Sequence, residues 1–136
     1  MSTTTVSGLG FHHIALKCQD IQKSISMYAA LGMKEVLRWG EGDSLIVMLD
    51  IGDGGRIELF ANGSEAFSAN GKWIHFALRT EDVEQAYAAA LAAGFVSKSA
   101  PQLLPLASSP APTSIHIAFV FGPDGEQVEF FREVRG

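Results

Sequence analysis

The 136-residue chain is long enough for one ordinary domain with a buried core, and 47% hydrophobic against 18% charged residues excludes an extended disordered chain. The formal net charge of −5 argues against nucleic acid as the main partner. The single cysteine, Cys18, excludes a disulfide framework, and no apolar run reaches the roughly 18 residues that a membrane span needs. We therefore expect a cytoplasmic protein without a membrane partner. Its Ser/Thr/Gly-rich start, 1–10, is expected to be a flexible leader, not a signal peptide.

The first predicted module, 11–61, reads as a strand, a helix and three further strands. Apolar and polar residues alternate over 11–17, which is typical of a strand with one buried face. Asp20 is suited to cap a helix with apolar residues at helical spacing, and Gly32 is expected to end that helix. Turns at 41–43 and 52–55 separate strands expected over 34–39, 44–50 and 56–61.

A polar linker over 62–71 leads to a second predicted module, 73–133, with the same order of elements. Four prolines between 101 and 113 exclude a central strand there, so this run is predicted to be a long loop. The other elements are a strand over 73–79, a helix over 83–92 stopped by Gly94, and strands over 95–99, 114–121 and 127–133.

The two modules repeat each other in sequence. HIALK at 13–17 returns as HFALR at 75–79, and the closing strands RIELF at 56–60 and QVEFF at 127–131 also match. The repeat predicts one α+β domain over 11–133, in which two βαβββ modules in a pseudo-twofold arrangement form an open half-barrel sheet.

Each module carries a His in its first strand and a Glu in its last. These are His13 and Glu58 in the first module, and His75 and Glu129 in the second. A lone strand His is usually structural, but an unpaired Glu is costly to bury, and both closing strands break their apolar pattern with Glu. If the sheets curl, two imidazoles and two carboxylates converge in a trough. Such a set suits one divalent ion (Ni, Zn, Co, Mn or Fe) with positions open for water or substrate.

The sequence resembles the vicinal oxygen chelate superfamily, which includes lactoylglutathione lyase (glyoxalase I), methylmalonyl-CoA epimerase, fosfomycin-resistance thiol transferases, ring-cleaving dioxygenases and bleomycin-resistance proteins. The order His, Glu, His, Glu resembles that of bacterial lactoylglutathione lyases, whereas the epimerases typically have Gln at the second position. The residues that carry the resemblance are His13 to Leu16, the segment from Asp20 to Gly32 with Ser24 and Tyr28, Ile57 to Leu59, His75 to Leu78, and Gly122 to Gly125 leading to Glu129.

The resemblance implies a metal-dependent lyase or isomerase of the glyoxalase type that moves a proton through a metal-bound enediolate. His13, Glu58, His75 and Glu129 would hold one divalent ion per site, and Glu129 would be the base, with Glu58 as the alternative. Two other functions stay open. One is a metal-dependent epimerase or another enzyme of the superfamily acting on a different small carbonyl substrate. The other is a non-catalytic, resistance-type protein that binds a small molecule. The resemblance also implies a homodimer.

Three further residues are candidates for binding the substrate. By resemblance, Lys17 matches an Arg, and Asn62 an Asn, that contact glutathione in the lyases; Arg79 shares a strand face with His75. A solvated strand end and a turn residue are the simple alternatives for Lys17 and Asn62. In the lyases, the region that corresponds to Pro101–Phe131 has cationic contacts to the thiol, but this chain has no Lys or Arg there. The expected substrate is a small carbonyl or hemithioacetal compound, with glutathione as one possible co-substrate. His12 is expected to face away from His13.

Overall fold

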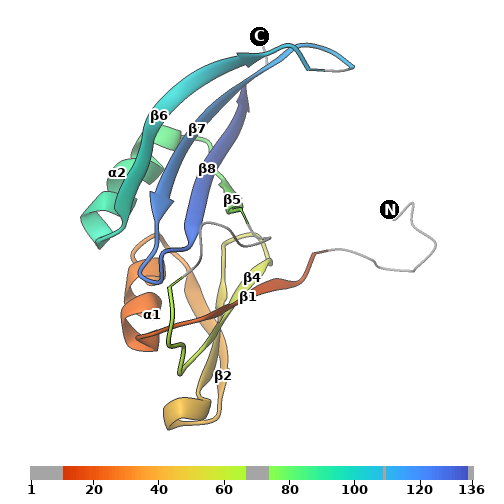
Figure 1. Cartoon of the computed structure of the whole chain (residues 1–136). Helices are drawn as coiled ribbons and strands as arrows, with labels where there is room; N and C mark the ends of the chain where they lie inside the picture. The colour runs from red at the N-terminus through yellow and green to blue at the C-terminus, as the bar shows by residue number, and fades with distance from the viewer. Residues whose placement is uncertain (1–10, 67–73, 109, 135–136) are drawn as a thin grey trace, which may run out of the picture.

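The structure, a computed structural model, describes residues 11–66, 74–108 and 110–134; the predicted leader and part of the predicted linker lie outside these ranges. Two modules follow each other along the chain (Figure 1). Each has one α-helix and four strands. The predicted α+β fold of two βαβββ modules is confirmed. Module one contains β1 (His13–Lys17), α1 (Ile21–Ala29), β2 (Lys34–Trp39), the short 3-10 helix η1 (Gly42–Ser44), β3 (Ile46–Asp50) and β4 (Arg56–Phe60). Module two contains β5 (Phe76–Arg79), α2 (Val83–Ala93), β6 (Val96–Leu106), β7 (Thr113–Phe121) and β8 (Gln127–Val134).

The strand order is the same in both modules. It is β1-β4-β3-β2 in the first sheet and β5-β8-β7-β6 in the second. The first strand of each module therefore runs parallel to its last strand. This pairing brings the beginning and the end of each repeat together, although more than 40 residues separate them in the sequence.

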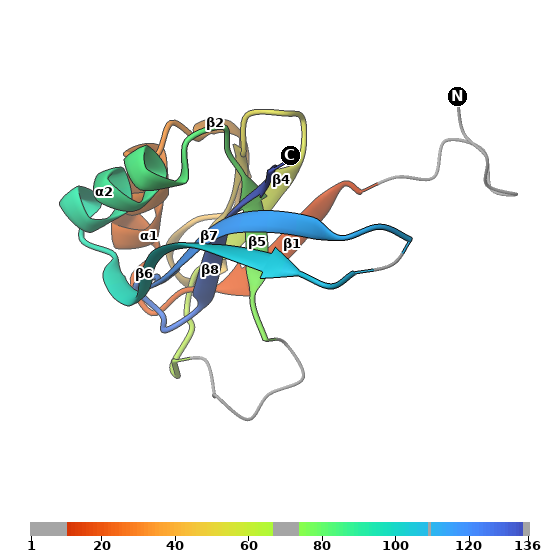
Figure 2. The same cartoon turned by 90° about the horizontal axis from the view of Figure 1, so that it is seen from above.

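The helices cover one face of each sheet and leave the other face without a helix. Both helices begin at an aspartate, Asp20 or Asp82, whose carboxylate accepts a hydrogen bond from a backbone N–H three residues on. Leu16, Ile57 and Leu59 point toward α1 and belong to the buried core. Figures 1 and 2 show α1 and α2 on the same side of the molecule. We call the opposite face of each sheet its helix-free face.

The Pro-rich run differs from its prediction as a loop. Its first half continues β6 as far as Leu106, and only 107–112 connect β6 to β7. The prolines of this run rule out a central strand. However, β6 is an edge strand, where a proline, which lacks an N–H, is tolerated. Pro105 lies in register with Ser114, and β6 and β7 extend past the body of the molecule as a long hairpin (Figure 2).

A buried polar network joins the two modules. The Tyr28 hydroxyl, on α1, donates to Glu126 Oε2 at 2.8 Å, and the backbone N–H of Gln19 donates to Asp124 Oδ1 at 2.7 Å. Asp124 lies in the turn between β7 and β8 and is only 1% exposed, and Glu126, just after that turn, is only 2% exposed. Because buried polar groups need partners, this network fixes how α1 sits against module two.

Replacing Tyr28 with Phe tests the network. The change leaves Glu126 without its hydroxyl donor, so we expect the free energy of unfolding to fall by about 1–3 kcal/mol. Tyr87→Phe is the control, because its hydroxyl bonds Ser97 Oγ at 2.7 Å in an exposed position and its loss is compensated by water. Denaturant unfolding of both variants measures the difference, and equal losses would contradict the role of the network.

Burial raises the pKa of Glu126 above its ordinary value of 4.5, and nearby Asp124 adds to the rise, although hydrogen bonds from Tyr28 and the backbone lower it. A raised pKa means that the folded state prefers the protonated carboxyl. The stability from this group is present below pH 4.5 and is lost as the pH rises through the folded-state pKa. We expect urea unfolding to show wild type losing stability relative to Glu126→Gln over this window, and a pH-independent difference would contradict the assignment.

Candidate metal centre

The first pair of predicted ligands comes together between β1 and β4. His13 Nε2 lies 3.3 Å from Glu58 Oε1. In register, Glu58 is opposite Ala15, so its side chain shares the helix-free face with His13. Glu58 is only 8% exposed, whereas the His13 imidazole is more accessible to solvent. Sequence alternation and the parallel pairing of β1 with β4 are sufficient to explain this contact.

The second pair reproduces the first in module two. His75 Nε2 lies 3.0 Å from Glu129 Oε1, and Glu129 is opposite Ala77 in register. Burial raises the pKa of the Glu129 carboxyl, although His75 opposes the rise through its charge and hydrogen bond. A carboxylate with a raised pKa is a stronger base than an ordinary one, which suits proton abstraction.

Two hydrophobic side chains that sequence reasoning did not single out complete these surroundings. Met48, on β3, is opposite Glu58 in register and is buried. Phe119, on β7, is opposite Glu129, and its ring meets the His75 ring edge to face with centroids 5.1 Å apart. The alternating pattern of 114–121 placed Phe119 on one face but could not show that this face carries Glu129.

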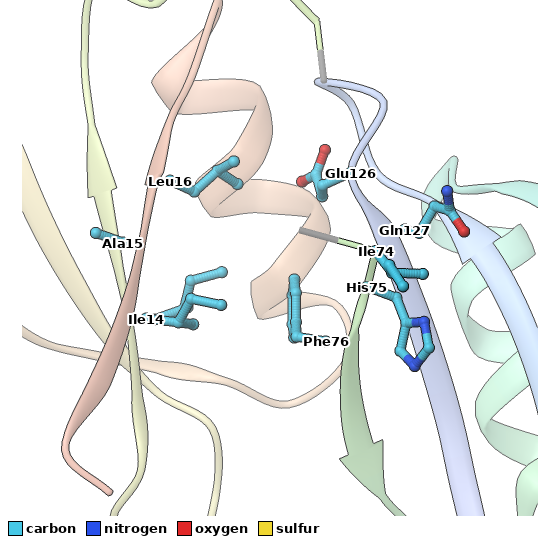
Figure 3. Close-up of a pocket in the computed structure, with 9 residues that line it drawn as sticks. Ile14, Ala15, Leu16, Ile74, His75, Phe76, Glu126 and Gln127 are labelled. Carbon is cyan, nitrogen blue, oxygen red and sulfur yellow. The ribbon is translucent and has the colours of Figure 1, made fainter. Parts of the chain in front are cut away.

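The two pairs do not merge into one cluster within the chain. Among the residues that the structure describes, no three His, Cys, Asp or Glu side chains come close enough to hold a metal ion. Between β1 and β5 lies a small hollow of about 90 Å³, where Ile14, Leu16 and Phe76 face one another, and His75 points away from them (Figure 3). The hollow is lined mainly by apolar side chains, with Glu126 and Gln127 also on its wall, and the four predicted ligands do not meet there.

The three predicted substrate-binding residues lie at the ends of strands. Lys17 is exposed at the end of β1, opposite Phe60. Asn62 is exposed just after β4 and has a left-handed backbone with φ of 68°, which favours Asn over most residues, as a turn position requires. Nothing in these positions tests a contact with substrate, so both assignments stay predictions.

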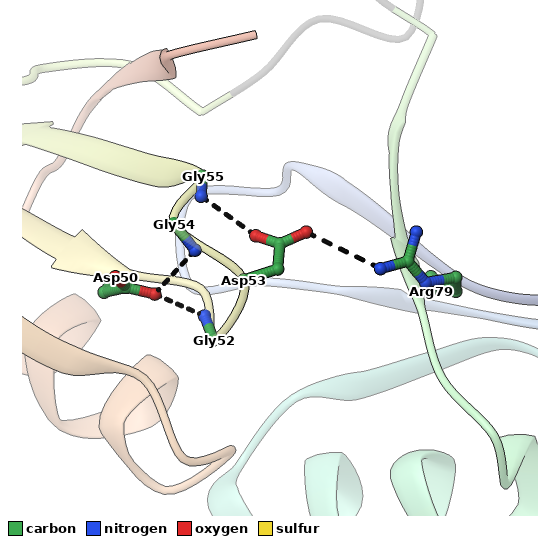
Figure 4. A network of polar contacts seen from close by, with 6 residues as sticks. All are labelled: Asp50, Gly52, Asp53, Gly54, Gly55 and Arg79. Carbon is green, nitrogen blue, oxygen red and sulfur yellow. Dashed lines mark hydrogen bonds and ion pairs between the residues drawn. The ribbon is translucent and has the colours of Figure 1, made fainter. Parts of the chain in front are cut away.

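Arg79 contacts the other module. Its Nη2 lies 3.9 Å from Asp53 Oδ2, in the turn between β3 and β4, and both side chains are largely exposed (Figure 4). Asp53 also accepts a hydrogen bond from the Gly55 N–H at 2.9 Å. An exposed pair at this distance contributes little to stability, which leaves the guanidinium available to a ligand.

His12 lies beside His13 and does not face away from it. Their Nδ1 atoms are 2.9 Å apart, and their rings meet edge to face. The prediction assumed strand alternation from residue 11, but β1 begins at His13, so alternation does not apply to His12. Similarly, the strand predicted over 73–79 begins only at Phe76, and residue 73 lies outside the described residues.

Each His–Glu pair has the chemistry of half a metal centre. An imidazole nitrogen and a carboxylate oxygen are ligands for Zn and similar divalent ions, but a metalloenzyme site usually takes at least three protein ligands. The donor types therefore fit a divalent ion, and each pair needs further ligands from outside its own module.

The fold of two βαβββ modules, with a His–Glu pair in each, is that of a glyoxalase-like protein. Residues 10–130 match the model of the Glyoxalase/Bleomycin resistance protein/Dioxygenase superfamily, and the chain belongs to this superfamily.

Within the described part of the chain, no helix is long and apolar enough to cross a membrane.

One relative by sequence and two solved structures illustrate what the chain is similar to. The chain is 32% identical over 127 residues to the uncharacterized protein YwbC of Bacillus subtilis. The match covers 88% of this chain and 94% of YwbC. A glyoxalase I variant from Zea mays superposes with a TM-score of 0.70 at 23% identity, covering 89% of this chain and 43% of that one. A glyoxalase family protein from Enterococcus faecalis gives a TM-score of 0.69 at 18% identity, covering 93% and 100%.

Proposed function

We propose that the protein is a metal-dependent lyase or isomerase of the glyoxalase type, acting on a small carbonyl or hemithioacetal substrate. The observation that carries the proposal is the repeated His–Glu pair, His13 with Glu58 and His75 with Glu129, at 3.3 and 3.0 Å. A binding protein without a metal has no need for two matched pairs of ligand-type side chains on helix-free faces.

The missing ligands come from a second copy of the chain. In the proposed homodimer, the helix-free face of module one in one copy meets that of module two in the other. Each of the two sites then receives four ligands. His13 and Glu58 come from one copy, and His75 and Glu129 come from the other. Exposed apolar side chains on the outer strands, Leu37 and Trp39 in β2 and Val96 in β6, support an assembly that covers these surfaces.

The protein side chains divide the chemistry between them. His13, Glu58, His75 and Glu129 would hold a divalent ion, which acts as a Lewis acid on the oxygens of a carbonyl substrate. Glu129 takes a proton from the carbon next to the carbonyl and returns it to the neighbouring carbon. Its low exposure and its contact with His75 support this role, and Glu58 in the equivalent position is the alternative base.

Metal analysis combined with a hemithioacetal assay tests the proposal. We expect the purified protein to retain a divalent ion from Ni, Zn, Co, Mn and Fe. We also expect it to isomerise the hemithioacetal of methylglyoxal with glutathione or a simpler thiol, followed in the ultraviolet. Metal retention without turnover of any hemithioacetal would favour an epimerase or another carbonyl substrate. Failure to bind metal would favour a non-catalytic binding protein.

A further inference from the structure

A bulge in β6 places a cation next to the second His–Glu pair. Ser97 is paired with Val120 and Ser99 with Phe119, so Lys98 is the extra residue between them. Bulges change the direction of a side chain and often lie next to sites. The Lys98 ammonium lies over the Phe119 ring, 5.1 Å from its centroid, and that ring contacts His75. One aromatic ring thus separates a positive charge from the His75–Glu129 pair.

Arg56 is the cation next to the first pair. It is opposite His13 in register and two residues before Glu58 in β4, so the three side chains share the helix-free face. Its Nη1 lies 3.9 Å from the sulfur of Met48, which is itself opposite Glu58. The guanidinium therefore lies along the sheet surface next to the predicted ligands.

Arg56 and Lys98 have no carboxylate within ion-pair distance among the described residues, whereas Arg38 pairs with Glu35 at 2.6 Å. An exposed lysine is solvated without a partner. Arg56 is half-buried, so its charge is less solvated than that of Lys98 and gains more from an anionic partner. The chain also has 15 acidic against 10 basic residues, so paired cations would be the easier outcome. A negatively charged ligand is the partner that this arrangement lacks.

We propose that Arg56 and Lys98 bind a carboxylate of the substrate, so that the substrate is a small carbonyl compound carrying a carboxylate. The inference rests on the proposed function, because the two cations flank one site only when module one of one copy faces module two of the other. A guanidinium matches a carboxylate with two parallel hydrogen bonds, and an ammonium adds a point charge. An anionic ligand also offsets the repulsion between these cations and a divalent ion.

Calorimetric titration with pyruvate and its uncharged amide, pyruvamide, tests the inference. The titrations use wild type, Arg56→Gln and Lys98→Gln, each with and without zinc. We expect wild type to prefer pyruvate, and each variant to lose about 10-fold of that preference, the usual effect of removing a hydrogen bond to a charged group. Arg38→Gln is the matched control, because Arg38 has its own carboxylate partner and lies on β2; its preference should stay at the wild-type level.

The two proposals fail in different ways in this experiment. Equal affinity of wild type for the two ligands, or an unchanged preference in both variants, would overturn the assignment of Arg56 and Lys98. Failure to bind zinc would overturn the metal-dependent function. In that case, the carboxylate site is still supported if the zinc-free wild type prefers pyruvate and this preference is lost in Arg56→Gln and Lys98→Gln.

Discussion

Replacing Glu129 with Gln is expected to lower turnover of a hemithioacetal by about 10²- to 10⁴-fold, the usual contribution of a positioned general base. The amide keeps the size of the side chain and one oxygen that can bind a metal, but it cannot accept the proton. Turnover is compared with wild type at saturating metal, so that weaker metal binding does not lower the rate. The far-ultraviolet circular dichroism and the unfolding midpoint of the variant show whether the fold is kept.

Glu133→Gln is the matched control for this variant. Glu133 lies on the same strand and the same face, four residues beyond Glu129, but it is exposed and opposite Ile115. It should retain wild-type turnover. The corresponding Glu58→Gln variant separates the two candidate bases. If it loses turnover at saturating metal while Glu129→Gln keeps it, the base is Glu58, and the assignment of Glu129 is wrong.

Replacing His75 with Ala is expected to lower the affinity for zinc by more than about 100-fold. Removing a group that only orients a ligand usually lowers metal affinity by roughly 10- to 100-fold, and loss of a ligand itself should cost more. The imidazole would be a direct ligand, and Ala supplies no donor in its place. Competition between the protein and a chromophoric chelator for zinc measures the affinity. His13→Ala should lose a similar amount, since the two modules hold equivalent positions.

His116→Ala is the control for loss of an imidazole. His116 lies on β7 with Nε2 3.6 Å from Glu84 on α2, so it faces the helix and not the helix-free face. Its removal should leave zinc affinity unchanged. Equal affinities of His75→Ala and His116→Ala would show that His75 is not a ligand.

The sequence is informative about each module because the module is repeated. HIALK and HFALR, with a Glu in each closing strand, were enough to predict the repeated order of elements and the strand faces that carry His13, Glu58, His75 and Glu129. Which strands pair with one another came from the structure. Strand alternation is a local property, and the duplicated pattern makes a chance coincidence improbable. The edge strand through the Pro-rich run was missed because proline excludes only the central positions of a sheet.

The relation between the modules could not be predicted in the same way. Convergence of four ligands in one chain was expected, but the described residues hold two separate pairs. A repeat predicts what each module contains, whereas the contact of Tyr28 with Glu126 joins residues almost a hundred positions apart and has no local pattern. The position of Lys98 over Phe119 likewise depends on a bulge that no periodicity indicates.

The most direct measurement is a mixing experiment with His13→Ala and His75→Ala. In the proposed homodimer, each variant alone would lack one ligand in every site. A dimer formed from one copy of each has one site with two missing ligands and one site that is intact. After the copies are exchanged by unfolding and refolding together, we predict that an equal mixture binds about a quarter of the zinc that wild type binds. A mixture that binds no more zinc than the separate variants would contradict a centre shared between two copies.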